Sequence, residues 1–256
     1  MYPKLISFDG FFIPTYGFFL FLGITLALIF GKKLSKKEGL DGNKFVDMGI
    51  SVLIFSFIGS KIFLLFTDFS YLKSLEGIWA LIRSGGVFLG GLLVGILVAF
   101  YYLKKYKFPL GPLADIYGIC IPLAHFFGRI GCFSAGCCWG KPCNLPWAVT
   151  FKNQFSAEYV GTPLFIPIHP TQIYEALFLL ALSFVLYFYF YKKRKFKGQV
   201  FLLYILFYSF YRFFIEFIRD DPRGYIFSLS TSQVISIFSF IISFYLYVRN
   251  YKKIQS

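Results

Sequence analysis

The chain has 256 residues, of which 57% are hydrophobic and 23% aromatic, and its mean hydropathy is +0.67. This composition excludes an ordinary water-soluble globular protein and predicts an all-α integral membrane protein. The formal net charge of +14 does not indicate a nucleic-acid-binding protein, because the basic residues stand in short clusters between apolar runs, as in membrane topology. We therefore expect membrane lipids as partners and no nucleic acid.

Seven apolar segments are long enough to cross a bilayer as helices. They run near residues 11–30, 45–66, 86–103, 112–130, 171–191, 200–218 and 231–248. The first has only Lys4 before it and no small-residue cleavage site after it, so we expect an uncleaved helix and not a removed signal peptide. The whole chain, 1–256, is predicted to be a single polytopic membrane domain.

Basic residues cluster after the first, third, fifth and seventh of these segments. The clusters lie at 32–44, 104–107, 192–197 and 249–253. By the positive-inside rule these four stretches face the cytoplasm. The alternation places the N-terminus outside and the C-terminus in the cytoplasm. It also makes the proline-containing loop at about 131–170 a small extracytoplasmic head.

Two features near the start of predicted helices allow two interpretations each. The first is the glycine-rich segment 85–91 at the start of the third helix. In it, Gly90 and Gly91 either pack closely against a neighbouring helix or let a ligand approach the backbone. The second is Tyr16, near the start of the first helix. It either belongs to a site or anchors the helix at the membrane interface, as tyrosine commonly does.

The most polar interruption of the apolar sequence runs from His125 to Cys143 and reads H-F-F-G-R-I-G-C-F-S-A-G-C-C-W-G-K-P-C. In it, Gly128 and Gly131 flank Arg129 closely, so backbone can approach whatever the guanidinium binds. An arginine at the edge of a membrane is costly and requires a ligand or partner. The alternative interpretation is a glycine-rich turn between helices, with the arginine extended to lipid phosphates.

Four cysteines fall within this same stretch, at Cys132, Cys137, Cys138 and Cys143. Their spacing matches no strong zinc signature. Free thiols that pack as small hydrophobic groups, or a disulfide, are the favoured interpretations. A structural or redox metal site is the alternative. We expect no metal and no cofactor.

The sixth predicted helix carries charges that share one face. Tyr208, Arg212, Glu216 and Arg219 follow at spacings of four, four and three residues. An unpaired arginine in hydrocarbon costs from about 2.5 to more than 10 kcal/mol. Glu216, one turn on, can reduce the cost of burying Arg212, and Tyr208 can hydrogen-bond the same group. A structural ion pair has the same appearance in sequence, but ionisable groups inside a membrane favour a functional role.

The fifth predicted helix begins with His169, Gln172 and Glu175 on roughly one side. His169 either caps the helix or belongs to a site. Together with the arginines, these groups suit the binding of a lipid phosphate and the stabilisation of a phosphate leaving group. The base would be His169, Tyr16 or a carboxylate. The sequence contains no HExxH, P-loop or GxSxG motif, which argues against protease, nucleotide-binding and hydrolase functions.

These motifs resemble those of the prolipoprotein diacylglyceryl transferase family. The matching elements are H-x-x-G-R-I-G-C-F-x-A-G-C-C-W-G-K-P, then H-P-T-Q-I-Y-E, then Y-x-x-x-R-F-x-x-E-F-x-R, in that order, together with the doubled glycines, Tyr16-Gly17 and G-S-K at 59–61. The resemblance implies a multi-pass enzyme of the bacterial plasma (inner) membrane with its site toward the outer leaflet. It would transfer the diacylglyceryl group of phosphatidylglycerol to the lipobox cysteine of exported, signal-peptide-bearing prolipoproteins, releasing glycerol phosphate.

The resemblance also implies roles for individual residues. Arg129 would hold the lipid phosphate, and Tyr208 and Arg212 would act at the reacting centre. Glu216 would position Arg212, and Tyr16 would line the cavity. The expected catalytic residues are Arg212, Tyr208, Tyr16, His169 and Glu216, and the expected substrate-binding residues are Arg129, Gly128, Gly131, Gly90, Gly91, Gln172 and Glu175.

The chain departs from the family pattern at several positions. Much of the family has a histidine just before the second glycine pair, where this chain has Leu89. The family's G-N-F-x-N-x-E continuation has Cys132, Ala135 and Cys137 at its three polar positions here. The base is therefore His169, a tyrosine, or the incoming thiol itself, ionised against the arginines.

The departures also leave room for other functions. One alternative is a non-enzymatic membrane transporter or lipid-binding paralogue, although the sequence has neither an internal repeat nor paired broken helices. The other is a cysteine-based membrane redox or metal protein.

Overall fold

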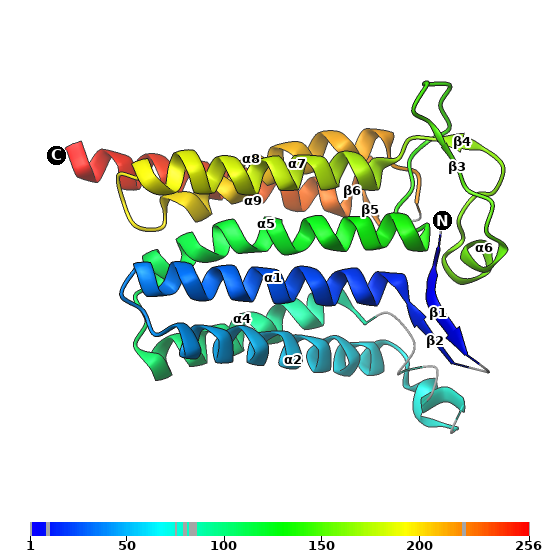
Figure 1. Cartoon of the computed structure of the whole chain (residues 1–256), viewed down its shortest axis with the longest axis horizontal. Coiled ribbons are helices and arrows are strands. Elements are labelled where there is room, and N and C mark those ends of the chain that lie inside the picture. Colours follow the sequence, from blue (N-terminus) through cyan, green and yellow to red (C-terminus); the bar gives the residue numbers. More distant parts are fainter. Residues whose placement is uncertain are drawn as a thin grey trace. The chain divides into compact units, whose positions relative to one another are not determined.

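The computed structural model describes residues 2–8, 11–74, 76–78, 81, 86–221 and 224–255, and most of them are helical (Figure 1). Within these residues, seven helices are long and apolar enough to cross a membrane. They are α1 (Thr15–Lys37), α2 (Gly42–Thr67), α4 (Phe88–Tyr106), α5 (Leu110–Ala135), α7 (Thr171–Val185) with the π-helical turn η2 (Leu186–Tyr191), α8 (Gln199–Ile215) with the 3-10 turn η3 (Glu216–Ile218), and α9 (Thr231–Gln255). The prediction of seven membrane helices is confirmed.

Both ends of α1 differ from the sequence prediction. Residues 11–14 are not helical: they form β2 (Phe11–Pro14), which pairs antiparallel with β1 (Lys4–Phe8), and α1 begins directly after Pro14. At the other end, α1 continues to Lys37, because lysine is a good helix former once the chain leaves the hydrocarbon.

The end of α5 changes the interpretation of the arginine motif. The helix was expected to end near residue 130 but continues to Ala135. Gly128, Arg129 and Gly131 therefore lie inside the helix, and the interpretation of this stretch as a glycine-rich turn between two helices is wrong.

The chain divides into two compact units, residues 31–110 and residues 1–30 with 111–256. In the first unit, which also holds the short 3-10 turn η1 (Phe69–Leu72), α2 and α4 pack through small residues. A Cβ atom on Gly90 would overlap the Phe63 side chain, and one on Gly91 would stand 3.0 Å from the carbonyl oxygen of Ser56. Close helix packing is therefore the observed use of Gly90 and Gly91.

In the second unit, α5, α7, α8 and α9 run alongside one another with the first half of α1 (Figure 1). Gly118 allows the backbones of α5 and α8 to pack closely, since a Cβ at this position would stand 2.8 Å from the Cα of Phe201 in α8. The buried carboxylate of Asp115 accepts hydrogen bonds from the backbone N–H groups of Gly198 (2.9 Å) and Val200 (2.8 Å). Asp115 thus satisfies donors at the start of α8 that no intrahelical carbonyl can reach.

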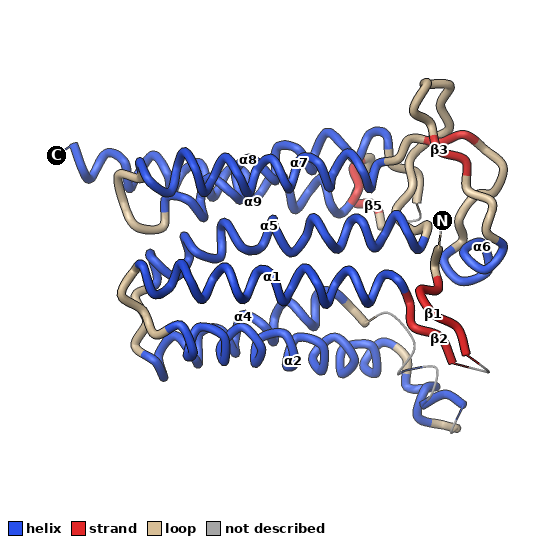
Figure 2. The backbone as a smooth tube through the Cα atoms, in the orientation of Figure 1, coloured by secondary structure: helices blue, strands red, loops and turns tan. Residues whose placement is uncertain are grey.

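A small folded region lies between α5 and α7 in sequence, as predicted for 131–170. It contains the strand pair β3 (Val149–Thr150) and β4 (Pro167–Ile168) and the short helix α6 (Gln154–Val160), seen in Figure 2 beyond the start of α7. Trp139, Phe151 and Ile168 form its buried hydrophobic core. A hairpin of β5 (Tyr225–Ile226) and β6 (Leu229–Ser230) leads into α9.

Candidate active site

Glu175, one turn into α7, is the centre of a buried polar network. Its side chain is fully buried, and its two oxygens face cationic groups from two other elements. Oε1 lies 3.0 Å from Nη2 of Arg129, and Oε2 lies 3.5 Å from Nη1 of Arg219. The hydroxyl of Tyr208 donates a hydrogen bond of 2.9 Å to Oε1. A buried carboxylate is tolerated here because it is paired and hydrogen-bonded at the same time.

His125 joins this network from α5, one turn before Arg129. Arg129 Nε donates a 3.1 Å hydrogen bond to Nε2 of His125, and the same imidazole nitrogen lies 3.9 Å from Oε1 of Glu175. The ring also stands edge-on to Tyr208, with centroids 5.6 Å apart. Because Nε2 accepts from a guanidinium, the imidazole in this arrangement is neutral and carries its proton on Nδ1.

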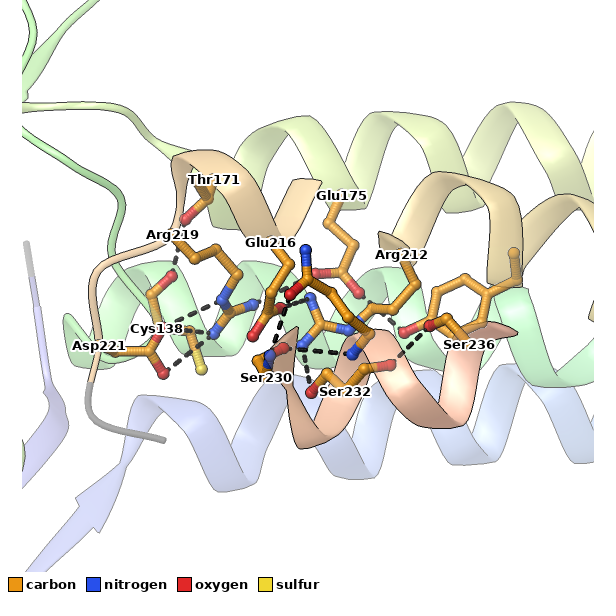
Figure 3. A network of polar contacts seen from close by, with 12 residues as sticks. Cys138, Thr171, Glu175, Arg212, Glu216, Arg219, Asp221, Ser230, Ser232 and Ser236 are labelled. Atoms are coloured by element: carbon orange, nitrogen blue, oxygen red, sulfur yellow. Dashed lines mark hydrogen bonds and ion pairs between the residues drawn. The ribbon is translucent and has the colours of Figure 1, made fainter. Parts of the chain in front are cut away.

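Two further arginines extend the network on the side of α8 and η3 (Figure 3). Arg212 pairs with Glu216 through Nη1 and Oε2 at 2.9 Å and donates through Nη2 to the hydroxyl of Ser232 at 3.2 Å. Arg219 donates two hydrogen bonds to the carboxylate of Asp221, from Nε to Oδ1 at 3.0 Å and from Nη2 to Oδ2 at 3.1 Å. This planar two-point geometry is the one that guanidinium groups also offer to phosphate.

The turn after α5 is attached to the first turn of α7 beside this network. The hydroxyl of Thr171 donates to the carbonyl of Cys138, and Nε2 of Gln172 donates to the carbonyl of Cys137, each at 2.7 Å. Hydrogen bonds from the Cys132 and Cys137 thiols, and then the charges of Arg219 and Arg129, lower the pKa of Cys138. The turn therefore brings a polarised thiol close to Arg219 (Figure 3).

The sequence of this chain matches known proteins over almost its full length. The model of the prolipoprotein diacylglyceryl transferase family matches residues 3–249. The chain belongs to this family. Proteins named phosphatidylglycerol–prolipoprotein diacylglyceryl transferase from Clostridium tetani and Finegoldia magna are 38% and 30% identical to it, over 96% of this chain in both cases and 97% and 94% of the relatives. A protein named phosphatidylglycerol–prolipoprotein diacylglyceryl transferase 2 from Clostridium perfringens is 35% identical over 92% of this chain and 90% of its own length.

Most of the residues expected from the diacylglyceryl transferase resemblance meet in this one network. Arg129 and Tyr208 contact Glu175 directly, and Arg212 and Glu216 form an ion pair of their own within reach of the charge of Glu175. As a member of the family with seven apolar helices, the chain is a multi-pass bacterial membrane protein.

Other expected residues lie around the network or outside it. Tyr16 packs against Gly131, where an added Cβ would stand 3.1 Å from the tyrosine Cα. Gly128 is buried, yet the position of its Cβ has open space with no heavy atom within 4 Å. His169 approaches the hydroxyl of Tyr174 at 3.4 Å, and in the described residues its ring contacts no member of the Glu175 network. Gly90 and Gly91 belong to the other unit.

Sequence reasoning missed three members of the network. His125 was the easiest of them to predict from the sequence, since it stands four residues before Arg129 and the two share a helix face. Asp221 and Ser232 carry no comparable signal, because their contacts with Arg219 and Arg212 depend on how the η3 turn and α9 fold back.

Chemically, such an arrangement can bind an anion, stabilise a developing negative charge and accept a proton. Three guanidinium groups converge on a region with one buried carboxylate at its centre, so an incoming phosphate meets prearranged donors. A neutral imidazole touches one of these guanidinium groups. Next to Arg129, a Cβ on Gly128 would meet no atom of another segment within 4 Å.

Proposed function

We propose that this chain transfers the diacylglyceryl group of phosphatidylglycerol to the cysteine thiol of a prolipoprotein lipobox, the first step of lipoprotein maturation. The observation that carries the proposal is the convergence of Arg129 and Arg219 on the buried Glu175, in a chain of this family. In the reaction, a carbon–sulfur bond forms at the glycerol carbon that carries the phosphate. The carbon–oxygen bond to the phosphate breaks, and glycerol phosphate leaves with the bonding electrons.

Arg129 and Arg212 are proposed to hold the phosphate and to stabilise the charge that develops on it. A guanidinium has five N–H donors, and the contacts of Arg129 with His125 and Glu175 engage two of them. Glu216 orients Arg212 from one turn away, and Tyr208 is held by Glu175. Such preorganised donors in a water-excluded site contribute typically about 3–4 kcal/mol each to transition-state stabilisation.

His125 is proposed as the base that takes the thiol proton. Its Nε2 accepts from Arg129 in the resting site. A phosphate that draws the guanidinium toward itself releases this lone pair, so lipid binding and activation of the base are linked. The imidazolium that forms is stabilised by Glu175, whose Oε1 lies 3.9 Å from Nε2. His125 would thus supply the histidine that the family often has at the position of Leu89.

The inner membrane is the proposed location, with the site toward the outer leaflet. Arg129 lies near the end of α5, Glu175 near the start of α7 and Arg219 just after α8. These ends lie opposite the ends that carry the basic clusters at 192–197 and 249–253, which the positive-inside rule assigns to the cytoplasm. An exported precursor would therefore meet the site on the side to which it is translocated.

The proposal is tested with purified full-length protein, phosphatidylglycerol and a lipobox peptide, with the peptide read by mass spectrometry. We expect a diacylglyceryl adduct on the cysteine, and its loss in Arg129→Ala and Arg212→Ala. Arg249→Ala is the matched control, because this arginine is exposed near the end of α9. No adduct from folded, lipid-bound wild-type protein would contradict the proposal, and so would equal activity in the three variants.

A further inference from the structure

Three cysteine thiols that the proposed reaction does not use meet at the end of α5. The sulfur atoms of Cys132, Cys137 and Cys138 all lie within 4.8 Å of one another. Cys132 is on the last turns of the helix, and the other two are on the turn that follows. The thiol of Cys137 also points back to the helix, with its sulfur 3.7 Å from the carbonyl oxygen of Cys132. The spacing of the four cysteines matches no strong zinc signature, and the fold shows that these three lie together.

The backbone of the turn is held in the conformation that gathers these sulfur atoms. Gly136 adopts a φ of 86° and donates its N–H to the carbonyl of Cys132 at 2.9 Å. Cys138 also has a positive φ, 66°, in the region that residues with a side chain rarely occupy. Its carbonyl is fixed by Thr171, and that of Cys137 by Gln172. Thr171 and Gln172, in the first turn of α7, therefore stabilise the strained backbone of residues 136–138. In this conformation the three thiols lie together.

A disulfide accounts poorly for this cluster. Cys137 and Cys138 are adjacent, so their Cα atoms are about 3.8 Å apart, below the roughly 4.4–6.8 Å of ordinary disulfides. A disulfide between Cys132 and either of them leaves the third sulfur beside the bond without a function. A metal ion uses all three, because Zn–S bonds of about 2.3 Å place tetrahedral sulfur ligands roughly 3.8 Å apart. Small side-chain rotations within the 4.8 Å limit suffice to reach that separation.

The surrounding charges suit a thiolate site. Three thiolates and one divalent ion carry a net charge of −1. Arg129 stands three residues before Cys132 on α5, about one helical turn away. Figure 3 shows Cys138 beside Arg219. Once a metal ion has displaced the thiol protons, these guanidinium groups balance the remaining negative charge of the site.

We propose that Cys132, Cys137 and Cys138 form a three-thiolate site for a thiophilic metal ion, with Zn²⁺ as the ion that the geometry and charge fit. The fourth tetrahedral position is left to water or another small ligand. The ion would clamp the turn after α5 to the helix end, a short distance along the helix from Arg129. The protons that the three thiols release on binding go to solvent. The inference does not depend on the proposed transferase activity.

The test is metal uptake by the reduced, purified full-length protein. Cd²⁺ serves as the spectroscopic probe through its sulfur-to-metal charge-transfer absorption, and Zn²⁺ is added as a competitor. We expect about one ion per chain. Cys132→Ser, Cys137→Ser and Cys138→Ser should each weaken binding by more than about 100-fold, beyond the loss of an outer-sphere partner. Cys120→Ser and Cys143→Ser are the matched controls, because these cysteines lie outside the cluster, and they should bind as the wild type does.

A measurement on the wild type covers the case in which a cluster variant fails to fold. Alkylation followed by peptide mapping, with and without Zn²⁺, should show Zn²⁺-dependent protection of Cys137 and Cys138, which are partly exposed, and none at Cys143. The inference is overturned if the reduced wild type takes up no Cd²⁺ or Zn²⁺. It is also overturned if Cys120→Ser or Cys143→Ser reduces binding as much as the cluster variants do, or if Zn²⁺ leaves alkylation of the cluster unchanged.

Discussion

Arg129 on α5 and Glu175 on α7 are joined by a 3.0 Å ion pair in which the carboxylate is completely buried. The pair fixes the end of one helix against the start of another at the level where the other charged groups gather. Because Glu175 also faces Arg219 and accepts from Tyr208, one carboxylate sets the positions of groups from three segments. The stability and the chemistry of the site therefore depend on the same side chain.

Replacing Glu175 with glutamine should lower both the stability of the protein and its activity. The amide keeps the shape but removes the charge that compensates Arg129 and Arg219. Breaking a buried pair in this way costs about 3–5 kcal/mol of unfolding free energy. We expect a lower unfolding temperature in detergent and loss of adduct formation. Glu158→Gln on α6 is the control, since Glu158 is exposed. A Glu175→Gln variant as stable and active as this control would contradict the central role of the carboxylate.

The two histidines of the chain give a matched pair for the base. His125 lies in the Glu175 network, whereas the ring of His169 approaches Tyr174. Loss of a general base typically reduces the rate about 10²–10⁴-fold. We expect His125→Ala to show such a loss in the chemical step, measured in single turnover, and His169→Ala to remain within a few-fold of wild type. The reverse order of effects would restore His169, one of the candidates that the sequence alone left open.

Gly128 and Gly131 flank Arg129 but should respond differently to substitution. An added Cβ on Gly128 meets open space, whereas one on Gly131 stands 3.1 Å from the backbone of Tyr16. Gly128→Leu should keep or raise stability, since leucine is a far better helix former than glycine, but should raise KM at least tenfold by filling the open space next to Arg129, which is proposed to hold the lipid phosphate. Gly131→Ala should instead lower the unfolding free energy by about 1–3 kcal/mol through overpacking. Thermal unfolding and steady-state kinetics separate the two effects, and unchanged KM in Gly128→Leu would show that the space is not used.

The sequence predicted the helices and part of the site for different physical reasons. Long apolar runs identify membrane helices directly, so all seven were found. Tyr208, Arg212 and Glu216 could be grouped because a single helix places every fourth residue on one face. The common partner Glu175 could only be named as a candidate, since spacing within α7 says nothing of how that helix is rotated against α5.

The errors also have identifiable causes. Hydropathy marks where an apolar run ends and not where the helix ends, so the continuation of α5 to Ala135 was missed and Arg129 was placed near a turn. The strand Phe11–Pro14 is as apolar as the helix that follows it, and only its pairing with Lys4–Phe8 distinguishes the two. The clustering of Cys132 with Cys137 and Cys138 depends on positive φ values at Gly136 and Cys138. The positive φ at a cysteine cannot be predicted from the residue pattern.

Asp115 offers a final prediction that separates stability from catalysis. Its carboxylate accepts from the N–H groups of Gly198 and Val200 at the start of α8, and it precedes Arg129 by about 21 Å along the helix axis, at 1.5 Å per residue. Asp115→Ala leaves these buried donors without their acceptor, at a cost of about 1–3 kcal/mol each. We expect a clear fall in unfolding temperature, with single-turnover activity per folded molecule within a few-fold of wild type. Asp47→Ala, at an exposed position on α2, is the control and should change neither. If Asp115→Ala abolished turnover in folded protein, the two ends of the helix bundle would have to be coupled, and capping of α8 would no longer be a sufficient account of this residue.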